Sequence, residues 1–227
     1  MIMDKHQLAI LKQKLAKEPI ALLGHEEFFK AGVCVLLLWI DEEYHFVFQK
    51  RTPHIPQGGE ICFPGGKFDP LYDQNFLDTA LRETEEEMGI SRSKLHVIGP
   101  LGTLITPAGM LIEAFIAVAQ ISSIEEIQIN EEEVEQIFTI PVSYFQKEVP
   151  LRYTLNIEMQ PFEIDAKGQE KILFPAREFP DIPVTYSKPW TRRNKYPIYV
   201  YPLDCFTLWG ITADLVYEFI KRIEKED

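Results

Sequence analysis

Residues 65–90 read GGKFDPLYDQNFLDTALRETEEEMGI, and no other stretch of the chain says more about its fold. A helix is predicted from about Asn75 to Met88, because Asp73 or Asn75 can cap its start and Gly89 stands where a left-handed residue ends a helix. The Gly-Gly pair upstream predicts a loop with unusual dihedral angles or with a backbone that approaches a ligand closely. We take this loop and the helix as the candidate site.

Three glutamates of the predicted helix fall on one side of it. Glu83, Glu86 and Glu87 are spaced i, i+3 and i+4, so they project within roughly 100° of one another. A separate sector of the helix can pack, and it is formed by Leu77, Leu81, Thr84 and Met88. Clustered carboxylates repel one another, and a hard divalent cation that prefers oxygen ligands relieves this repulsion. Three glutamates by themselves fit a solvated acidic face as well.

Strand patterns precede and follow this helix. Apolar or alternating runs predict strands at residues 31–40, 45–50, 60–63, 95–98, 102–105, 111–119, 137–141, 151–159 and 196–201. Helical spacing predicts amphipathic helices at residues 4–17 and 212–223. This order of elements predicts a mixed α/β or α+β sandwich.

The composition excludes several classes of protein. The 227 residues carry a formal net charge of −12, from 35 acidic and 23 basic residues, which opposes nucleic-acid binding. The longest apolar run, residues 31–40, is about half the ~20 residues of a membrane helix, and lysines interrupt residues 1–18. Three widely spaced cysteines predict neither a disulfide framework nor a zinc site. We therefore expect a cytoplasmic protein without membrane or nucleic-acid partners.

The chain changes character after Pro150. Seven prolines stand from Pro161 to Pro202, interleaved with aromatic residues, and proline cannot donate to a sheet ladder. Most of residues 161–195 are therefore predicted to be irregular or edge structure. We interpret residues 1–227 as one domain, with an N-terminal helix within residues 1–20 and a proline-rich insertion of unassigned role at 161–195.

The stretch from Arg82 to Ile90 resembles the Nudix box. That consensus has a glycine, five residues, Glu, seven residues, Arg-Glu, an apolar residue, any residue, Glu-Glu, any residue, Gly and an apolar residue. The second half matches except at Thr84. The first half is two residues longer from Gly66 to Arg82, and Asp73 stands in for its glutamate. The resemblance implies a Nudix-type α/β/α sandwich with a mixed sheet.

Further segments resemble the coenzyme A pyrophosphatase group of Nudix enzymes. They are FPGGK at 63–67, TALRE at 79–83, the stretch 130–141 with Glu-Val-Glu, Phe and Pro, and LWGITA at 208–213. The group also has a coenzyme A motif upstream of the Nudix box, and this chain keeps only part of it. Arg51 and Gly59 are present, but the second arginine of the motif is missing and the spacing is one residue shorter. Residues 31–150 and 196–223 carry the resemblance.

The resemblance implies hydrolysis of a diphosphate bond in a nucleoside diphosphate derivative, with Mg²⁺ or Mn²⁺ as cofactor. Coenzyme A or an acyl-coenzyme A is the favoured substrate, giving 3′,5′-ADP and a 4′-phosphopantetheine. The alternatives are ADP-ribose, a dinucleotide or a nucleoside triphosphate as substrate, and a non-catalytic Nudix-like binding module. The oligomeric state stays open, with a homodimer as one alternative.

The resemblance also assigns roles to residues. The implied metal ligands are the carbonyl of Gly66 and the carboxylates of Glu83, Glu86 and Glu87. The implied catalytic residues are Arg82, Glu83, Glu86 and Glu133: Arg82 orients Glu83, and Glu86 or Glu133 takes a proton from water. The expected substrate-binding residues are Lys50, Arg51 and Lys67, and Arg192 and Arg193 can replace the missing arginine. Cys62 and Trp209 are expected in the core.

Overall fold

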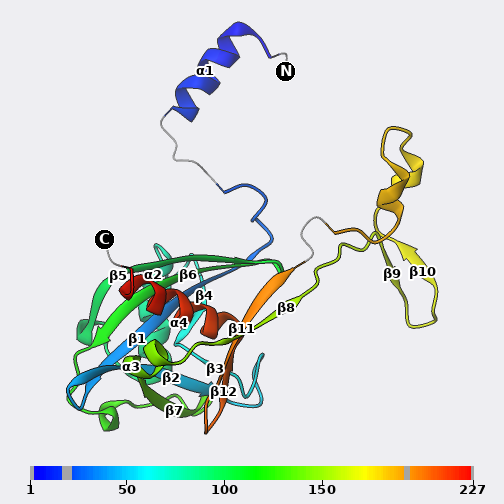
Figure 1. Ribbon diagram of the computed structural model, residues 1–227. Coiled ribbons are helices and arrows are strands. Elements are labelled where there is room, and N and C mark those ends of the chain that lie inside the picture. Colours follow the sequence, from blue (N-terminus) through cyan, green and yellow to red (C-terminus); the bar gives the residue numbers. More distant parts are fainter. Residues whose placement is uncertain (1–2, 17–21, 192–194, 226–227) are drawn as a thin grey trace.

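The computed structural model describes residues 3–16, 22–191 and 195–225, and its centre is a mixed β-sheet covered by helices (Figure 1). The sheet contains β1 (Phe29–Ile40), β2 (Glu43–Arg51), β3 (Ile61–Cys62), β4 (Gly65–Lys67), β5 (Leu95–Thr106), β6 (Met110–Ala119) and β7 (Val134–Pro141). Its main order is β3-β2-β1-β6-β5, with β4 paired to β1 and β7 paired to β2. Strands β1 and β6 run parallel, whereas the other pairs of this sheet are antiparallel. The prediction of a mixed sheet is confirmed.

Helices cover both faces of the sheet, because β1 and β2 alternate apolar side chains between the two faces. On one face, Leu36 and Leu38 of β1 share a core with Ala80 and Met88 of α2 (Phe76–Met88). On the other face, residues of β1 and β2 form a core with α3 (Val142–Lys147) and α4 (Gly210–Ile223) that includes Val35, Phe46, Phe48, Phe145, Val216 and Phe219. The architecture is therefore the expected α/β/α sandwich.

The bounds of α2 follow from its two caps and from one glycine of the sheet. The side chain of Asn75 accepts a hydrogen bond from the backbone of Asp78, so Asn75 and not Asp73 is the N-cap. Gly89 ends the helix with φ 64°, in the left-handed region. Gly32 of β1 lies against the first turn of α2, where a Cβ atom would overlap the carbonyl oxygen of Phe76. This close approach sets the distance of α2 from the sheet.

Some expected boundaries were wrong. Residues 95–98 and 102–105 belong to one strand, β5, which passes Pro100 through register shifts between Val97 and Gly99 and between Pro100 and Gly102. Such β-bulges let an edge strand bend without ending. The short elements β4, α3 and β12 (Thr207–Trp209) were not predicted, because a few residues show no periodicity.

The N-terminal helix forms where it was expected, as α1 (Lys5–Leu15), with a capping box between Asp4 and Gln7. No residue of α1 is buried, and Leu8, Leu11 and Leu15 are 58%, 40% and 59% exposed. The apolar side of this helix therefore contributes nothing to the core of the sandwich. Among the described residues, no helix has the length and apolar character needed to cross a membrane.

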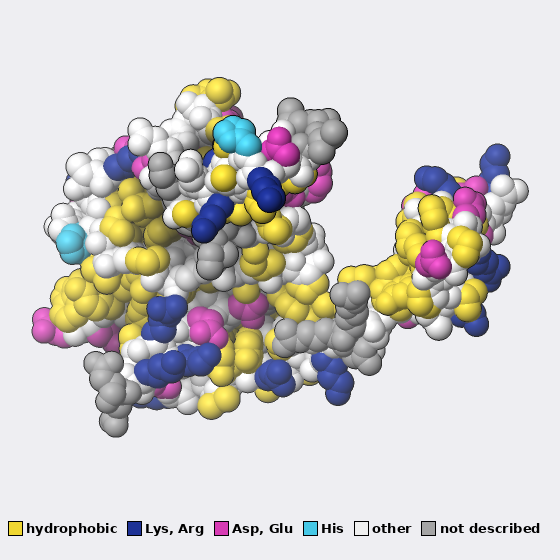
Figure 2. Space-filling model, turned by 90° about the horizontal axis from the view of Figure 1, so that it is seen from above, with side chains coloured by type: hydrophobic (Ala, Val, Ile, Leu, Met, Phe, Trp, Pro, Cys, Tyr) yellow, Lys and Arg dark blue, Asp and Glu magenta, His cyan; other side chains and the backbone are white. Residues whose placement is uncertain are grey.

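The chain beyond α3 forms a second sheet and an arm. This sheet has the order β12-β11-β8, with β8 at Leu151–Leu155 and β11 at Tyr196–Pro202. Between β8 and β11, the arm (residues 156–195) carries the hairpin β9 (Phe162–Ile164) and β10 (Glu170–Ile172) and two 3-10 helices, Ala176–Glu178 and Val184–Ser187. Two further 3-10 helices lie in the sandwich, at Arg92–Lys94 and Ile124–Glu126. The arm stands apart from the sandwich as a separate lobe (Figures 1 and 2).

Candidate active site

The candidate site lies where α2 meets the loop that follows β4. A hollow of about 570 Å³ opens there, lined by Lys67, Phe68, Asp69, Pro70, Tyr72, Arg82, Glu83 and Glu86. Its polar wall comes from α2 and its aromatic wall comes from the loop. The hollow therefore places carboxylates of the predicted metal site beside rings and a lysine.

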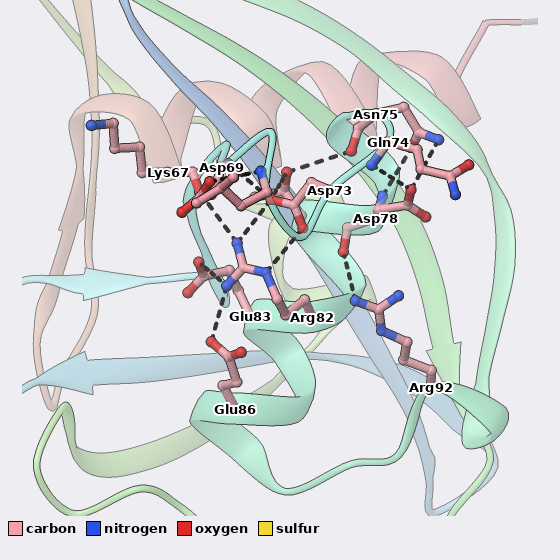
Figure 3. A network of polar contacts seen from close by, with 12 residues as sticks. Lys67, Asp69, Asp73, Gln74, Asn75, Asp78, Arg82, Glu83, Glu86 and Arg92 are labelled. Atoms are coloured by element: carbon pink, nitrogen blue, oxygen red, sulfur yellow. Dashed lines mark hydrogen bonds and ion pairs between the residues drawn. The ribbon is translucent and has the colours of Figure 1, made fainter.

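Arg82 lies at the centre of a polar network on the wall of this hollow (Figure 3). Its Nε and Nη2 donate to the two carboxylate oxygens of Asp73, each at 2.9 Å. Its Nη1 donates to Glu83 at 2.8 Å and to Glu86 at 3.0 Å. The hydrogen bonds from Arg82 lower the pKa of Asp73 to about 2, and those to Asp73 and Glu83 raise the pKa of Arg82. One guanidinium thus holds three carboxylates in place.

Glu83 is packed against the backbone of Gly66, which lies in the short strand β4; the prediction of a loop at the Gly-Gly pair was wrong, because both glycines pair with β1. A Cβ atom on Gly66 would overlap the Glu83 carboxylate, so this approach requires glycine. Burial raises the pKa of Glu83, Arg82 lowers it, and the negative charges of Glu86 and Glu133 add to the increase. The backbone near Glu133 is anchored by Thr52, whose N–H donates to the Glu133 carbonyl at 2.9 Å. Glu133 therefore adds a negative charge to the surroundings of Glu83, and its backbone is held by the residue directly after β2.

Glu87 points inward and is almost fully buried, with 1% of its surface exposed. Its carboxylate accepts from the backbone N–H of Gly65 at 3.0 Å, and Arg51 Nη1 lies 3.7 Å from it. Burial raises the pKa of Glu87 to about 7, although hydrogen bonds from Gln49 and Gly65 lower it. The protein thus surrounds this buried carboxylate with a cationic neighbour, Arg51, and with hydrogen-bond donors.

The donor types fit a divalent cation, although the described residues do not yet converge on one point. Across the described ranges, no three His, Cys, Asp or Glu side chains are grouped as a metal site. Glu83 and Glu86 are held by Arg82, while Glu87 faces Gly65. Glu86 is the freest of them, because its side chain is 56% exposed and exposed pairs contribute only about 0–1 kcal/mol. Of the three glutamates, Glu86 is therefore the one whose side chain is held least by the protein.

The three residues expected to bind substrate lie in different places. Lys67 lines the hollow beside the carboxylates. Arg51 is held by Glu87 and by the Pro56 carbonyl, which accepts from its Nε at 3.2 Å. Lys50 is paired with Glu135 at 2.7 Å. Arg192 and Arg193 lie outside the described residues. Of these three residues, Lys67 lines the hollow, whereas Lys50 and Arg51 are held by other groups of the protein.

The structure also shows site residues that the sequence analysis did not single out. Gln49 is fully buried, and its amide lies between Glu87 and Cys62. The sequence could have indicated the burial of Gln49, because Gln49 lies on the same face of β2 as the buried Val47. Phe68 and Tyr72 line the hollow and gave no periodic signal. These three residues complete the surroundings of the carboxylates.

One expected core residue is half exposed. Trp209 has 49% of its surface exposed and lines a second hollow of about 560 Å³, together with Lys50, Phe138 and Phe206. The expectation for Trp209 was wrong because Trp209 stands at the end of β12, immediately before α4 begins.

Cys62 is half-buried, and burial raises the pKa of its thiol to about 11. Such a thiol is a weak nucleophile.

The comparisons with known proteins identify the family of this chain. The NUDIX domain family matches residues 29–156, more than half of the chain, and the chain therefore belongs to it. The uncharacterized Nudix hydrolase NudL of Yersinia pestis (strain Pestoides F) is 32% identical over 130 residues, which cover 55% of this chain and 64% of that relative. The matched residues include α2 and all strands of the first sheet.

Solved Nudix structures are similar to part of the chain. A C. elegans Ap4A hydrolase is 19% identical with a TM-score of 0.42, over 50% of this chain and 80% of that structure. The NUDIX domain of Shewanella oneidensis NrtR, complexed with ADP ribose, is 20% identical with a TM-score of 0.40, over 59% and 84% respectively.

Proposed function

We propose that this protein is a metal-dependent pyrophosphohydrolase that cleaves a diphosphate bond in a nucleoside diphosphate derivative. The observation that carries the proposal is the set of carboxylates on α2, with Glu83 against the Gly66 backbone and Glu83 and Glu86 held by Arg82. Family membership supports the same reaction class. A binding module without catalysis gives no reason to bury Glu87 beside two further carboxylates.

Glu83, Glu86, Glu87 and the carbonyl of Gly66 are the proposed ligands of Mg²⁺ or Mn²⁺. When bound, such a cation neutralises the diphosphate and acidifies a water molecule. Arg82 keeps Glu83 oriented through a charge-assisted hydrogen bond. Either Glu86 or Glu133 accepts the proton of the attacking water, because Glu86 borders the hollow and Glu133 lies near Glu83. Lys67 is placed to contact a substrate phosphate.

Coenzyme A or an acyl-coenzyme A is the proposed substrate, with 3′,5′-ADP and a 4′-phosphopantetheine as products. The Phe-Pro-Gly-Gly entry and the Trp-Gly-Ile-Thr-Ala segment support it by their resemblance to coenzyme A pyrophosphatases. A planar base can stack on Phe68 or Tyr72, and such stacking serves any adenine nucleotide. ADP-ribose, a dinucleotide and a nucleoside triphosphate are therefore the alternatives that a substrate panel must include.

The test is a panel of coenzyme A, NADH and ADP-ribose with Mg²⁺ or Mn²⁺, in which released products are measured for the wild type, Glu86→Gln and Glu85→Gln. Glu86→Gln should lower turnover by at least ~100-fold, the upper end of losses for supporting metal-site partners. Glu85→Gln is the matched control, because Glu85 is exposed on the same helix and does not line the hollow.

The outcomes of this panel distinguish the proposed function from its alternatives. Cleavage of coenzyme A supports the full proposal, whereas cleavage of another diphosphate alone keeps the reaction and replaces the substrate. Full activity of Glu86→Gln, or of the wild type in excess EDTA, would contradict the metal-dependent reaction. Binding of every compound without cleavage would favour the non-catalytic module.

A further inference from the structure

The arm is attached to the sandwich through a ribbon of two strands, β8 and β11 (Figure 1). Among the residues that the structure describes, strand β8 lies at the edge of its sheet, because the sheet order ends β11-β8. All five residues of β8 are exposed. An edge strand with free backbone groups can pair with another chain unless the fold protects it.

Strand β8 lacks the protection that another edge strand of this protein has. The long edge strand β5 contains two register shifts and Pro100, and bulges and prolines hinder pairing at an edge. Strand β8 is regular along its contact with β11 and contains no proline. It carries a single charged residue, Arg152. The edge of β8 is therefore suited to accept a further strand.

One face of the ribbon is apolar. Leu151, Tyr153 and Leu155 alternate along β8 and are 47%, 57% and 53% exposed. Their partners across the ribbon are Val200, Ile198 and Tyr196. The opposite face carries Arg152, which pairs with Tyr199 across the ribbon, and Tyr199 stacks on Tyr217 of α4. The apolar row thus points away from α4 and stays open to a partner.

We propose that a second copy of this chain pairs with the free edge of β8, antiparallel and about a two-fold axis at Tyr153. In this register Tyr153 lies opposite the partner's Tyr153, and Leu151 lies opposite the partner's Leu155. Arg152 lies opposite the partner's Thr154, so no like charges face each other. The apolar rows of the two copies become continuous, and the contact is isologous and closes at two copies.

The charge distribution favours this arrangement. Of the 35 acidic and 23 basic residues, the arm (residues 156–195) holds six acidic and seven basic ones. The remainder therefore holds 29 acidic and 16 basic residues. Because β8 leads from the sandwich into the arm, antiparallel pairing places each arm beside the acidic sandwich of the other copy. The described part of the arm, with six acidic and five basic residues, is close to neutral, so this contact avoids bringing two acidic sandwiches together.

Two five-residue strands by themselves are small against the roughly 1,200 Å² that a specific interface buries. The arm supplies further apolar surface, because Ile172, Leu173, Phe179 and Val184 are 61%, 53%, 51% and 65% exposed. Figure 2 shows hydrophobic side chains on the surface of the arm. Packing of the arm on the second copy would bury these apolar side chains, which are exposed to water in a monomer.

The register can be tested with the full-length chain and opposite charges at one position. Tyr153→Lys and Tyr153→Asp should each turn the dimer, of twice 26.3 kDa, into a monomer, because like charges then face each other on the axis. An equimolar mixture of the two variants should restore a dimer. Light scattering after gel filtration measures the mass, and Ile98→Asp on β5, equally 57% exposed, is the matched control.

A cross-link tests the same contact without a charge. Paired Cα atoms of antiparallel strands lie about 4.5–5.5 Å apart, within the range of a disulfide. Tyr153→Cys should oxidise to a covalent dimer, in a background where exposed Cys205 is replaced by Ser. Ile98→Cys in that background should stay monomeric. A monomeric wild type throughout the micromolar range, or a mixture of charge variants that stays monomeric, would overturn the proposal.

Discussion

Replacement of Asp73 by Asn tests whether Arg82 is held by this buried carboxylate. Asp73 accepts four hydrogen bonds, two from Arg82, one from the Thr79 hydroxyl and one from the Asp69 N–H. Its Oδ2 takes three of them, so an asparagine that keeps its oxygen there loses the bond from Arg82 Nε. A bond to a charged group contributes about 1.5–3 kcal/mol, and breaking a buried pair costs about 3–5 kcal/mol. We expect a loss of about 3 kcal/mol.

Urea unfolding of wild type, Asp73→Asn and the exposed control Glu85→Gln measures this loss. The control should stay within about 0.5 kcal/mol of the wild type. Because the pKa of Asp73 is lowered from 3.8 to about 2, its stabilising effect is complete above 3.8 and is lost as the pH falls toward 2. The difference between wild type and Asp73→Asn should shrink in that window. A variant as stable as the control at neutral pH would refute the reasoning.

Two further predictions concern the Gly-Gly pair of β4 and helix α4. Gly66→Val should lose most turnover of the substrate found in the panel while the protein still unfolds cooperatively, because a side chain at position 66 would displace the Glu83 carboxylate; normal turnover would show that catalysis does not depend on this close approach. Asp214→Asn should raise the melting temperature at neutral pH, because burial, with a contribution from Glu218, raises the pKa of Asp214 to about 6 and disfavours its ionised form. This gain should fade as the pH is lowered from 6 toward 3.8, and a gain independent of pH would contradict the electrostatic cause.

Periodicity predicted the parts of the fold that bury regular faces. The strands around residues 31–40 and 111–119 and helix α2 were predicted because their apolar residues repeat over nine or more positions. The two short pieces β4 and β12 each have three residues and depend on a partner strand rather than on their own pattern. The parallel contact of β1 with β6 is likewise a property of the whole sheet, which spacing along the chain does not contain.

The part of the candidate site that lies on helix α2 was predictable from the sequence. Helical spacing placed Glu83, Glu86 and Glu87 together, but it did not show that Arg82 holds two of them while the third faces Gly65. The contact between Arg51 and Glu87 joins residues far apart in sequence. Arg51 was expected to contact substrate, but in the structure it lies beside the Glu87 carboxylate. Long-range pairs of this kind depend on how the sheet places β2 relative to α2, which the spacing along the chain does not contain.

The contact between Asp73 and Arg82 shows how a departure from the Nudix consensus keeps its chemistry. The consensus glutamate stands eight residues before the arginine, whereas Asp73 stands nine residues before Arg82 and has a side chain shorter by one methylene. The longer loop after Gly66 lets the backbone of Asp73 turn toward the helix, where Asp69 N–H and Thr79 fix its carboxylate. Both oxygens then meet the guanidinium at 2.9 Å. The spacing differs from the consensus, yet Asp73 holds Arg82 through both carboxylate oxygens, and Arg82 in turn holds Glu83.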